Sequence, residues 1–167
     1  RSARSMSRPG REPEDPCDVD ACRESALRLL DAADRPSGAL RDRLIDKGYD
    51  DETVAAVVDR LIEVGLVDDE SYAQSAVRYC VGRLMGYRGA VMELARKGVD
   101  RPLAERVCDE ARMSGVFEDA AWELGRRSAA KTQGMDPKVR KRRFWSSGGR
   151  KGHDAETLRA VAHELFD

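Results

Sequence analysis

The sequence predicts an all-α protein built from three tandem three-helix repeats, which form an elongated, curved array after a disordered N-terminal tail. The 167 residues are rich in charged side chains (37%) and poor in aromatic ones (5%), which is typical of helices rather than of a β-sandwich. Apolar residues recur at helical spacing, and a Lys-Gly turn followed by an Asp occurs three times. We therefore expect a tail at 1–21 and repeats at 22–66, 67–115 and 116–167.

The first 21 residues are expected to lack a stable fold. They are dominated by Arg, Pro, Glu, Asp and Ser and contain almost no apolar side chains. Such a segment buries too little surface to offset the entropy lost on ordering. We therefore predict that deleting residues 1–20 leaves the melting temperature of the protein unchanged.

The helices of the first repeat can be placed by their end signals. Ser37 is the expected N-cap of the second helix, and Gly48 ends that helix. Asp50 or Asp51 is the expected N-cap of the third helix, and Gly65 ends it. Between these signals, apolar residues follow the i, i+3, i+4, i+7 spacing of a helix with one buried face. In the third helix these residues are Val54, Val57, Val58, Leu61 and Ile62.

The turn between the second and third helices recurs in all three predicted repeats. A Lys-Gly pair ends one helix, one residue follows, and an Asp begins the next helix, which suits a left-handed glycine C-cap and an Asp N-cap. We therefore expect positive φ at Gly48 and Gly98. Repeats of this kind contact mainly their neighbours, so they present a long surface. The three copies are Lys47-Gly48-Tyr49-Asp50, Lys97-Gly98-Val99-Asp100 and Lys151-Gly152-His153-Asp154.

Charge is distributed unevenly along the chain. Residues 126–151 contain 10 basic and 1 acidic side chains, a local net charge of +9 in a protein whose net charge is −1. Because acidic partners are scarce in this segment, phosphate groups are the expected counterions, and the alternative is a solvated helix face. The candidate nucleic-acid or filament-binding residues are Arg126, Arg127, Lys131, Lys138, Arg140, Lys141, Arg142, Arg143, Arg150 and Lys151.

Two aromatic residues, Phe144 and Trp145, lie within this basic segment. They would either stack on nucleic-acid bases or, for at least one of them, fill the core of the third repeat. If the basic residues act on the surface, reversing the charges at 140–143 should weaken polyanion binding and leave the fold nearly intact.

No residues form a recognisable catalytic, cofactor or metal site. The four cysteines include no Cys-x-x-Cys pair and the two histidines are His153 and His163, so the ligand spacing of a zinc site is absent. The acidic cluster at 68–70 is expected to begin a helix, where free N–H groups stabilise carboxylates. Cys80 and Cys108 are expected to be buried, reduced thiols. We therefore expect no catalytic residue, no metal, no cofactor and no enzymatic activity.

A set of residues in the first two repeats forms a distinctive pattern, and its most specific stretch is Gly-Leu-Val-Asp-Asp-Glu-Ser-Tyr-Ala at 65–73. The pattern comprises Ser37, Leu40, Leu44, Lys47, Gly48, Tyr49, Asp50, Val54, Val57, Val58, Leu61, Gly65, Leu66, Val67, Asp68, Asp69, Glu70, Tyr72, Ala73, Gly86, Gly89, Leu94, Lys97, Gly98 and Val99. It resembles the bacterial regulatory protein RecX family over about 22–167, most strongly over 37–100. Where that family tends to carry an Arg-Gly-Phe type of turn in the third repeat, this chain has Lys-Gly-His after Ser-Ser-Gly-Gly.

The resemblance implies three tandem three-helix repeats and a regulator of the RecA recombinase. It implies binding to RecA and to the RecA–DNA filament, inhibition of recombinase, ATPase and coprotease activities, and modulation of DNA repair and the SOS response. Contact with single- or double-stranded DNA is a further expectation.

The alternative function is a nucleic-acid-binding helical module that acts through the basic third repeat and needs no protein partner. We expect a cytoplasmic monomer. No membrane association is expected, because no stretch approaches the ~18 consecutive apolar residues of a transmembrane helix.

Overall fold

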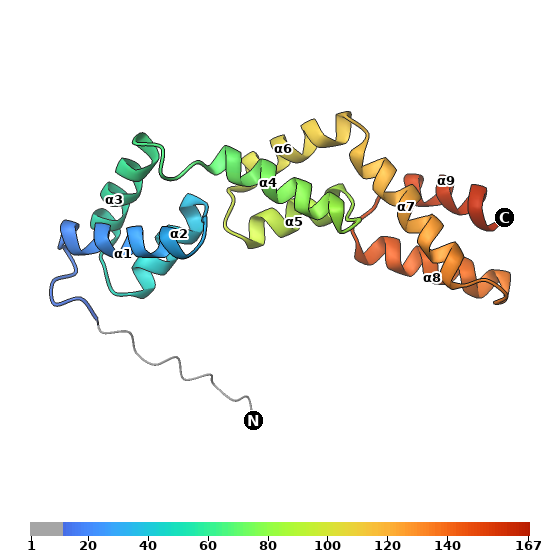
Figure 1. The fold of residues 1–167 in the computed structure, drawn as a ribbon, viewed down its shortest axis with the longest axis horizontal. Coiled ribbons are helices and arrows are strands. Elements are labelled where there is room, and N and C mark those ends of the chain that lie inside the picture. Colours follow the sequence, from blue (N-terminus) through green and yellow to red (C-terminus); the bar gives the residue numbers. More distant parts are fainter. Residues whose placement is uncertain (1–11) are drawn as a thin grey trace, which may run out of the picture. The chain divides into compact units, whose positions relative to one another are not determined.

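The structure is a computed structural model that describes residues 12–167, and every regular element in this part of the chain is an α-helix (Figure 1). The all-α prediction is therefore confirmed. The helices are α1 (Val19–Ala32), α2 (Ser37–Asp46), α3 (Asp51–Glu63), α4 (Asp69–Gly82), α5 (Tyr87–Arg96), α6 (Arg101–Met113), α7 (Val116–Lys131), α8 (Pro137–Arg150) and α9 (Ala155–Phe166).

The helices form three repeats, α1–α3, α4–α6 and α7–α9, with the same turn before the last helix of each. The φ angle is 108° at Gly48, 101° at Gly98 and 81° at Gly152. A side chain with a Cβ is strained in this left-handed region, so glycine is favoured at all three turns. The positive φ predicted at Gly48 and Gly98 is confirmed. The buried residues that follow these glycines are Tyr49, Val99 and His153.

The Asp that follows each turn is the N-cap of the third helix, but its side chain does not act alike in all repeats. Asp50 accepts a hydrogen bond from the Thr53 amide at 2.7 Å, and Asp154 accepts one from the Thr157 amide at 2.8 Å. Asp100 makes no such bond, and Pro lies at the second position of its helix. The predicted capping is therefore correct for two of the three side chains.

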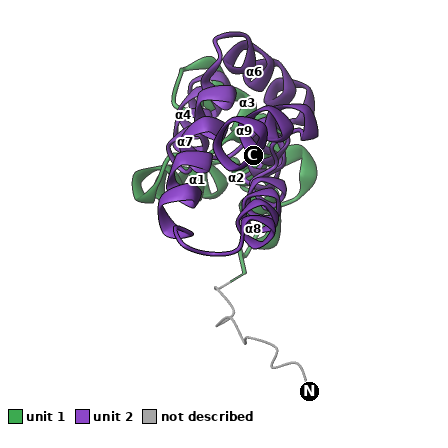
Figure 2. Cartoon of the chain, turned by 90° about the vertical axis from the view of Figure 1, so that its right-hand side faces the viewer, with its two compact units in different colours: residues 1–69 green, residues 70–167 purple. Residues whose placement is uncertain are grey.

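Two compact units make up the chain, residues 1–69 and residues 70–167 (Figure 2). In the first unit, α1, α2 and α3 pack around one apolar core, since each helix has one apolar face. The largest fully buried side chains of this core are Leu40, Leu44, Val54, Val57 and Val58.

The second unit contains the other two repeats, which are joined by a close backbone contact. The Gly86 amide donates a hydrogen bond to the Lys151 carbonyl at 2.8 Å, and Lys151 Nζ donates one to the Arg83 carbonyl at 2.8 Å. A Cβ at Gly152 would lie 2.1 Å from the Gly89 nitrogen, and one at Gly89 would lie 2.3 Å from the Lys151 carbonyl oxygen. Only glycine fits at positions 89 and 152, and the absence of side chains there lets the α4–α5 loop pack directly against the α8–α9 turn.

A buried histidine completes this junction. His153 is 7% exposed, and its Nε2 lies 2.8 Å from the carbonyl oxygen of Leu84, whose φ is 62°. The neutral ring donates this hydrogen bond as the Nε2–H tautomer. Burial lowers the pKa of His153, although the bond to Leu84 and the charge of Asp154 act in the opposite direction.

The N-terminal segment differs from its expected role as a disordered tail. Helix α1 begins at Val19, and its N-cap Asp18 accepts a hydrogen bond from the Ala21 amide. The Pro16 carbonyl accepts a hydrogen bond from the Asp50 amide at 3.1 Å. The expected disorder therefore does not extend over residues 16–21, and for residues 1–11 the prediction lies outside the described residues.

Ser37 also differs from its predicted role as an N-cap. It is the first residue of α2, after the N-cap Pro36, and its hydroxyl makes no cap bond. Its amide and hydroxyl instead donate hydrogen bonds to the Asp69 carboxylate at 2.6 and 2.5 Å. The first turn of α2 is thus capped by a carboxylate 32 residues away, a contact that local sequence patterns do not predict.

The Ser-Ser-Gly-Gly segment belongs to the end of α8 and is helical throughout. Gly148 faces the core, where a Cβ would lie 2.3 Å from Leu158 Cδ2. Phe144, one helical turn earlier, is fully buried and stacks on Phe166 with ring centroids 5.4 Å apart. The core-packing alternative is therefore correct for Phe144, and its ring is not available to stack on bases.

Candidate nucleic-acid interface

The basic segment extends over the end of α7, the loop after it and the whole of α8. Asp136 caps α8 by accepting a hydrogen bond from the Lys138 amide at 2.9 Å, and Pro137 occupies the first helical position. One face of α8 buries Phe144 and Gly148. The basic side chains therefore lie on the remaining faces, and their contacts divide them into groups.

Arg140 and Lys141 are engaged in internal contacts. Arg140 donates hydrogen bonds to Thr132 Oγ1 and to the Ala129 carbonyl, both at 3.1 Å, and its guanidinium lies over the Phe166 ring. Lys141 pairs with Asp167, and this hydrogen bond and a second one from His163 lower the pKa of the Asp167 carboxyl. The contacts of Arg140 argue against the expectation that charge reversal at this position leaves the fold intact.

Arg126, Arg127 and Arg150 have partners on their own helices at the surface. Arg127 and Arg126 both pair with the Glu123 carboxylate at 3.1 Å, and their hydrogen bonds lower its pKa. Arg150 donates a hydrogen bond to Ser146 Oγ at 2.8 Å. Exposed contacts of this kind contribute little to stability, so these arginines can exchange their partners for an anion.

Four of the candidate residues are exposed and make no side-chain hydrogen bond or ion pair with any described residue. They are Lys131 at the end of α7 and Lys138, Arg142 and Arg143 on α8. Their charges are compensated only by solvent and ions. Binding of a polyanion would neutralise these four charges without breaking an existing contact, which favours the complex.

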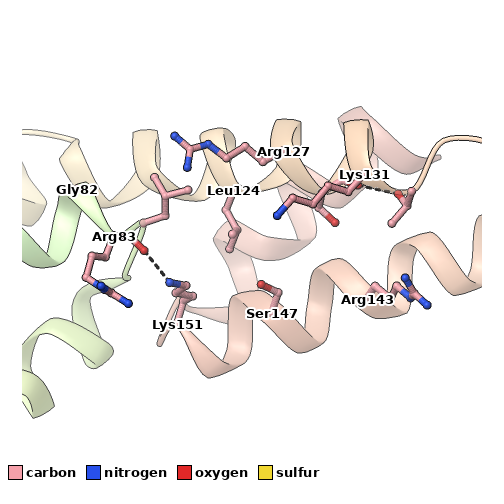
Figure 3. Close-up of a pocket in the computed structure, with 11 residues that line it drawn as sticks. Gly82, Arg83, Leu124, Arg127, Lys131, Arg143, Ser147 and Lys151 are labelled. Atoms are coloured by element: carbon pink, nitrogen blue, oxygen red, sulfur yellow. Dashed lines mark hydrogen bonds between the residues drawn. The ribbon is translucent and has the colours of Figure 1, made fainter.

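A cavity of about 480 Å³, named here the α7–α8 groove, lies between the two helices (Figure 3). It brings together Arg127, Lys131, Arg143 and Lys151 from the predicted set and adds Arg83 from the loop after α4. No acidic side chain lines it. The lining residues are Gly82, Arg83, Leu84, Leu124, Arg127, Ser128, Lys131, Thr132, Arg143, Ser147 and Lys151.

Sequence reasoning missed Arg83 because this residue lies more than 40 positions before the basic segment, among mixed charges. The junction at Gly86 and Lys151 brings Arg83 to the groove. The alignment of the repeats shows that the Lys-Gly turn of the third repeat has a counterpart in the second repeat. It does not show which loop packs on the turn of the third repeat.

The remaining candidate features have structural roles. Asp69 begins α4 and binds Ser37, and Glu70 pairs with Arg106, as expected for an acidic helix start. Cys80 and Cys108 are buried free thiols, and burial raises the pKa of Cys108 to about 12. Within residues 12–167, no cluster of metal-ligating side chains occurs. None of the described helices combines the length and the apolar character needed to span a bilayer.

Relatives of this chain are found by sequence comparison. A family model for the first three-helix domain of RecX matches residues 22–61. Regulatory protein RecX of Thermobifida fusca (strain YX) is 37% identical over 147 residues, 86% of this chain and 78% of the relative. The RecX of Streptomyces lividans is 32% identical over 163 residues, 96% and 85% of the two chains. The RecX of Mycobacterium sp. (strain JLS) is 43% identical over 100 residues, which span 58% of this chain and 54% of the relative.

Solved structures agree on the fold. The crystal structure of RecX from Lactobacillus salivarius matches with a TM-score of 0.78 at 20% sequence identity, over 89% of this chain and 96% of that chain. A second RecX crystal structure matches with a TM-score of 0.75 at 18% identity, over 87% and 73% of the two chains.

Three helical repeats, with a cationic groove on the third, define a helical-repeat protein whose candidate site is a binding surface. The sequence relatives specify which protein of this class it is. The chain belongs to the RecX family. It is a regulatory protein of that family, whose members inhibit RecA.

Proposed function

We propose that this protein binds the RecA–DNA filament, inhibits its strand-exchange, ATPase and coprotease activities, and contacts DNA through the basic third repeat. Membership in the RecX family supports RecA as the target. The observation that supports DNA contact is the convergence of five basic side chains on the α7–α8 groove. By controlling RecA, the protein modulates DNA repair and the SOS response, and it acts as a cytoplasmic monomer.

The charge distribution favours a division of labour between the repeats. Residues 126–151 carry a net charge of +9, whereas residues 22–66 carry 7 basic and 10 acidic side chains. Phosphates attract the first segment and repel the second, so we assign DNA contact to the third repeat. The acidic first repeat is then suited to basic protein surface on RecA, because complementary potentials favour one orientation of docking.

The proposed inhibition is tested by measuring the DNA-dependent ATPase and strand-exchange activities of RecA as this protein is added, with DNA in large excess. A protein that only competes for bare DNA is titrated away by the excess, whereas a protein that binds the filament is not. We expect inhibition to persist. Loss of inhibition in excess DNA would leave the nucleic-acid-binding module as the function.

The proposed DNA contact is tested with the double variant Lys131→Glu/Arg143→Glu. The matched control is Lys47→Glu/Arg43→Glu, which makes the same changes at two exposed positions at the end of α2. We expect only the first variant to weaken binding to bare and RecA-coated DNA, at unchanged helical content. Equal losses in both variants would show that net charge alone is responsible.

A further inference from the structure

We infer that residues 12–17, named here the cap segment, form an N-terminal cap on the array of repeats. On the Lys-Gly turn of the first repeat, this segment takes the position that the loop of the preceding repeat takes on the turn of the third repeat. The inference concerns an interaction surface of the first repeat, and it does not depend on the proposed function.

The third repeat shows how a Lys-Gly turn is covered by a neighbouring segment. The turn lies so close to the α4–α5 loop that a Cβ on Gly152 would lie 2.1 Å from the Gly89 nitrogen. A backbone hydrogen bond joins the two segments, from the Gly86 amide to the Lys151 carbonyl at 2.8 Å. One face of the turn is therefore a docking surface for the backbone of another segment.

The turn of the first repeat has the same left-handed glycine, and the cap segment lies on it (Figure 1). A Cβ on Gly48 would lie 3.1 Å from Cδ of Pro13. The amide of Asp50 donates a hydrogen bond to the Pro16 carbonyl at 3.1 Å. The glycine and the backbone of this turn are thus both contacted by another segment, as they are in the third repeat.

A side chain of the cap segment makes a further contact with the same aspartate. The Cys17 thiol donates a hydrogen bond to Asp50 Oδ2 at 2.6 Å, while Oδ1 accepts the bond from the Thr53 amide. The bond from Cys17 lowers the pKa of the Asp50 carboxyl, and the bonds from Thr53 lower it further. Asp50 therefore begins α3 and also binds the cap segment, which couples docking of the segment to the start of that helix.

Charge also favours this docking. A cavity of about 550 Å³ is lined by the cap segment, by α1 and by the end of α2 with the turn after it. Glu12 and Glu14 line it on the side of the cap segment. The opposite side carries three basic residues and one acidic residue, which are Arg28, Arg43, Lys47 and Asp46. Opposite charges therefore face each other across the cavity and attract the segment to the repeat.

The composition of the cap segment reduces the cost of ordering it. Its sequence is Glu-Pro-Glu-Asp-Pro-Cys, and each proline fixes its own φ at about −65°, so fewer conformations are lost on docking. The Asp15 carbonyl accepts a hydrogen bond at 3.1 Å from the amide of Asp18, the N-cap of α1. Because the segment is held at this end, its effective concentration at the turn is high.

The cap segment also gives this end of the array a polar surface. Glu12, Glu14 and Asp15 are exposed, and terminal units of repeat proteins need a polar outer face for solubility. Because the segment belongs to the same chain as the turn, it covers the turn at any protein concentration. A second copy of the chain is thereby kept from docking on this face.

The inference is tested by deleting residues 1–17 from the full chain, with deletion of residues 1–11 as the matched control that retains the cap segment. Hydrogen exchange followed by NMR reports on single amides. We expect the Asp50 amide to exchange at least about fivefold faster without residues 1–17, because its acceptor is lost. The control should exchange as the full chain does. Equal rates in the two deletions would overturn the inference.

A second pair of variants tests the docking without shortening the chain. Glu12→Lys/Glu14→Lys reverses charges that line the cavity, and Asp31→Lys/Asp34→Lys makes the same changes at exposed positions outside it. We expect only the first variant to speed exchange at the Asp50 amide. The Thr53 amide, which is bonded to Asp50 itself, should keep its protection in both. Equal acceleration in the two variants would contradict the inference.

The charge variants also decide the outcome if deletion of residues 1–17 unfolds the first repeat and removes protection at Thr53 as well. In that case, faster exchange at Asp50 alone in Glu12→Lys/Glu14→Lys supports the cap, and an unchanged rate overturns it. Measurement at several protein concentrations identifies what covers the turn. A wild-type rate at Asp50 that does not depend on concentration supports the cap segment, whereas a rate that falls as concentration rises would assign the turn to a second copy.

Discussion

The guanidinium of Arg140 lies over the aromatic ring of Phe166, with its central carbon 5.3 Å from the ring centroid. Its hydrogen bonds to Thr132 and to the Ala129 carbonyl connect α8 to the end of α7, while the ring belongs to α9. Arg140 lies in the most basic run of the sequence, yet its side chain makes structural contacts among the three helices of the third repeat.

Arg140→Ala is expected to destabilise the protein by roughly 1–3 kcal/mol, because it removes two charge-assisted hydrogen bonds and a cation–π contact. Urea unfolding followed by circular dichroism measures this change. Lys138→Ala, at an exposed residue without a side-chain partner among the described residues, should change the free energy of unfolding by less than about 0.5 kcal/mol. Equal effects would mean that Arg140 is not structurally engaged in solution.

Gly98→Val is expected to cost roughly 1–2 kcal/mol, because a β-branched residue is strained at a φ of 101°. Gly149→Ala serves as the control, since this helical glycine has open space around its missing Cβ and alanine favours the helix. The control should be neutral or slightly stabilising. A Gly98→Val protein as stable as wild type in urea would contradict the left-handed turn.

Gly152→Ala is expected to destabilise the protein more than either Gly98→Val or Gly149→Ala, because it combines a φ of 81° with a Cβ placed 2.1 Å from the Gly89 nitrogen. The α4–α5 loop and the α8–α9 turn must then move apart, and we expect a loss above about 2 kcal/mol. Since this movement also displaces Arg83 from the groove, DNA binding should fall even at temperatures where the variant remains folded. Wild-type binding by the folded variant would show that the junction does not position Arg83.

Stability is expected to fall as the pH drops below about 6.5, the ordinary pKa of histidine. Burial lowers the pKa of His153, with a small further contribution from Lys151, so the unfolded chain takes up a proton at pH values where the folded protein does not. Protonation therefore favours the unfolded state until the pH falls below the folded pKa. His153→Gln keeps a donor for the Leu84 carbonyl but does not titrate.

The measurement is the urea midpoint of wild type and His153→Gln at several pH values between about 5 and 8, where histidine titrates. The variant should show a flatter profile than wild type over this range. Parallel profiles would assign the pH dependence to other groups.

Asp69→Ala is expected to destabilise the unit of residues 1–69 by about 1–2 kcal/mol, because it removes the carboxylate that caps the first turn of α2. Asp59→Ala is the control, as its contact with Arg41 is long, at 3.9 Å, and exposed. Exposed pairs of this kind contribute little, so the control should unfold close to the wild-type midpoint. A similar loss in both variants would count against the Ser37–Asp69 contact.

The sequence alone determined the helical class, the three repeats, their glycine turns and most of the groove's cations. These features follow from local rules: apolar spacing places the buried face of each helix, and a left-handed turn selects glycine wherever it occurs. The sign and position of the basic segment are likewise properties of consecutive residues, as is the family pattern at 65–73.

The tertiary structure decided which of those cations are available and what surrounds them. Arg140 and Arg143 are three residues apart in one basic run, yet the first packs on Phe166 and the second lines an open groove. Arg83 joins that groove, and Asp69 replaces the expected cap of α2, through contacts that span 68 and 32 residues of sequence. Such pairings depend on how separate helices and loops pack against one another in three dimensions. The spacing of residues along the chain and the composition of a segment do not specify this packing.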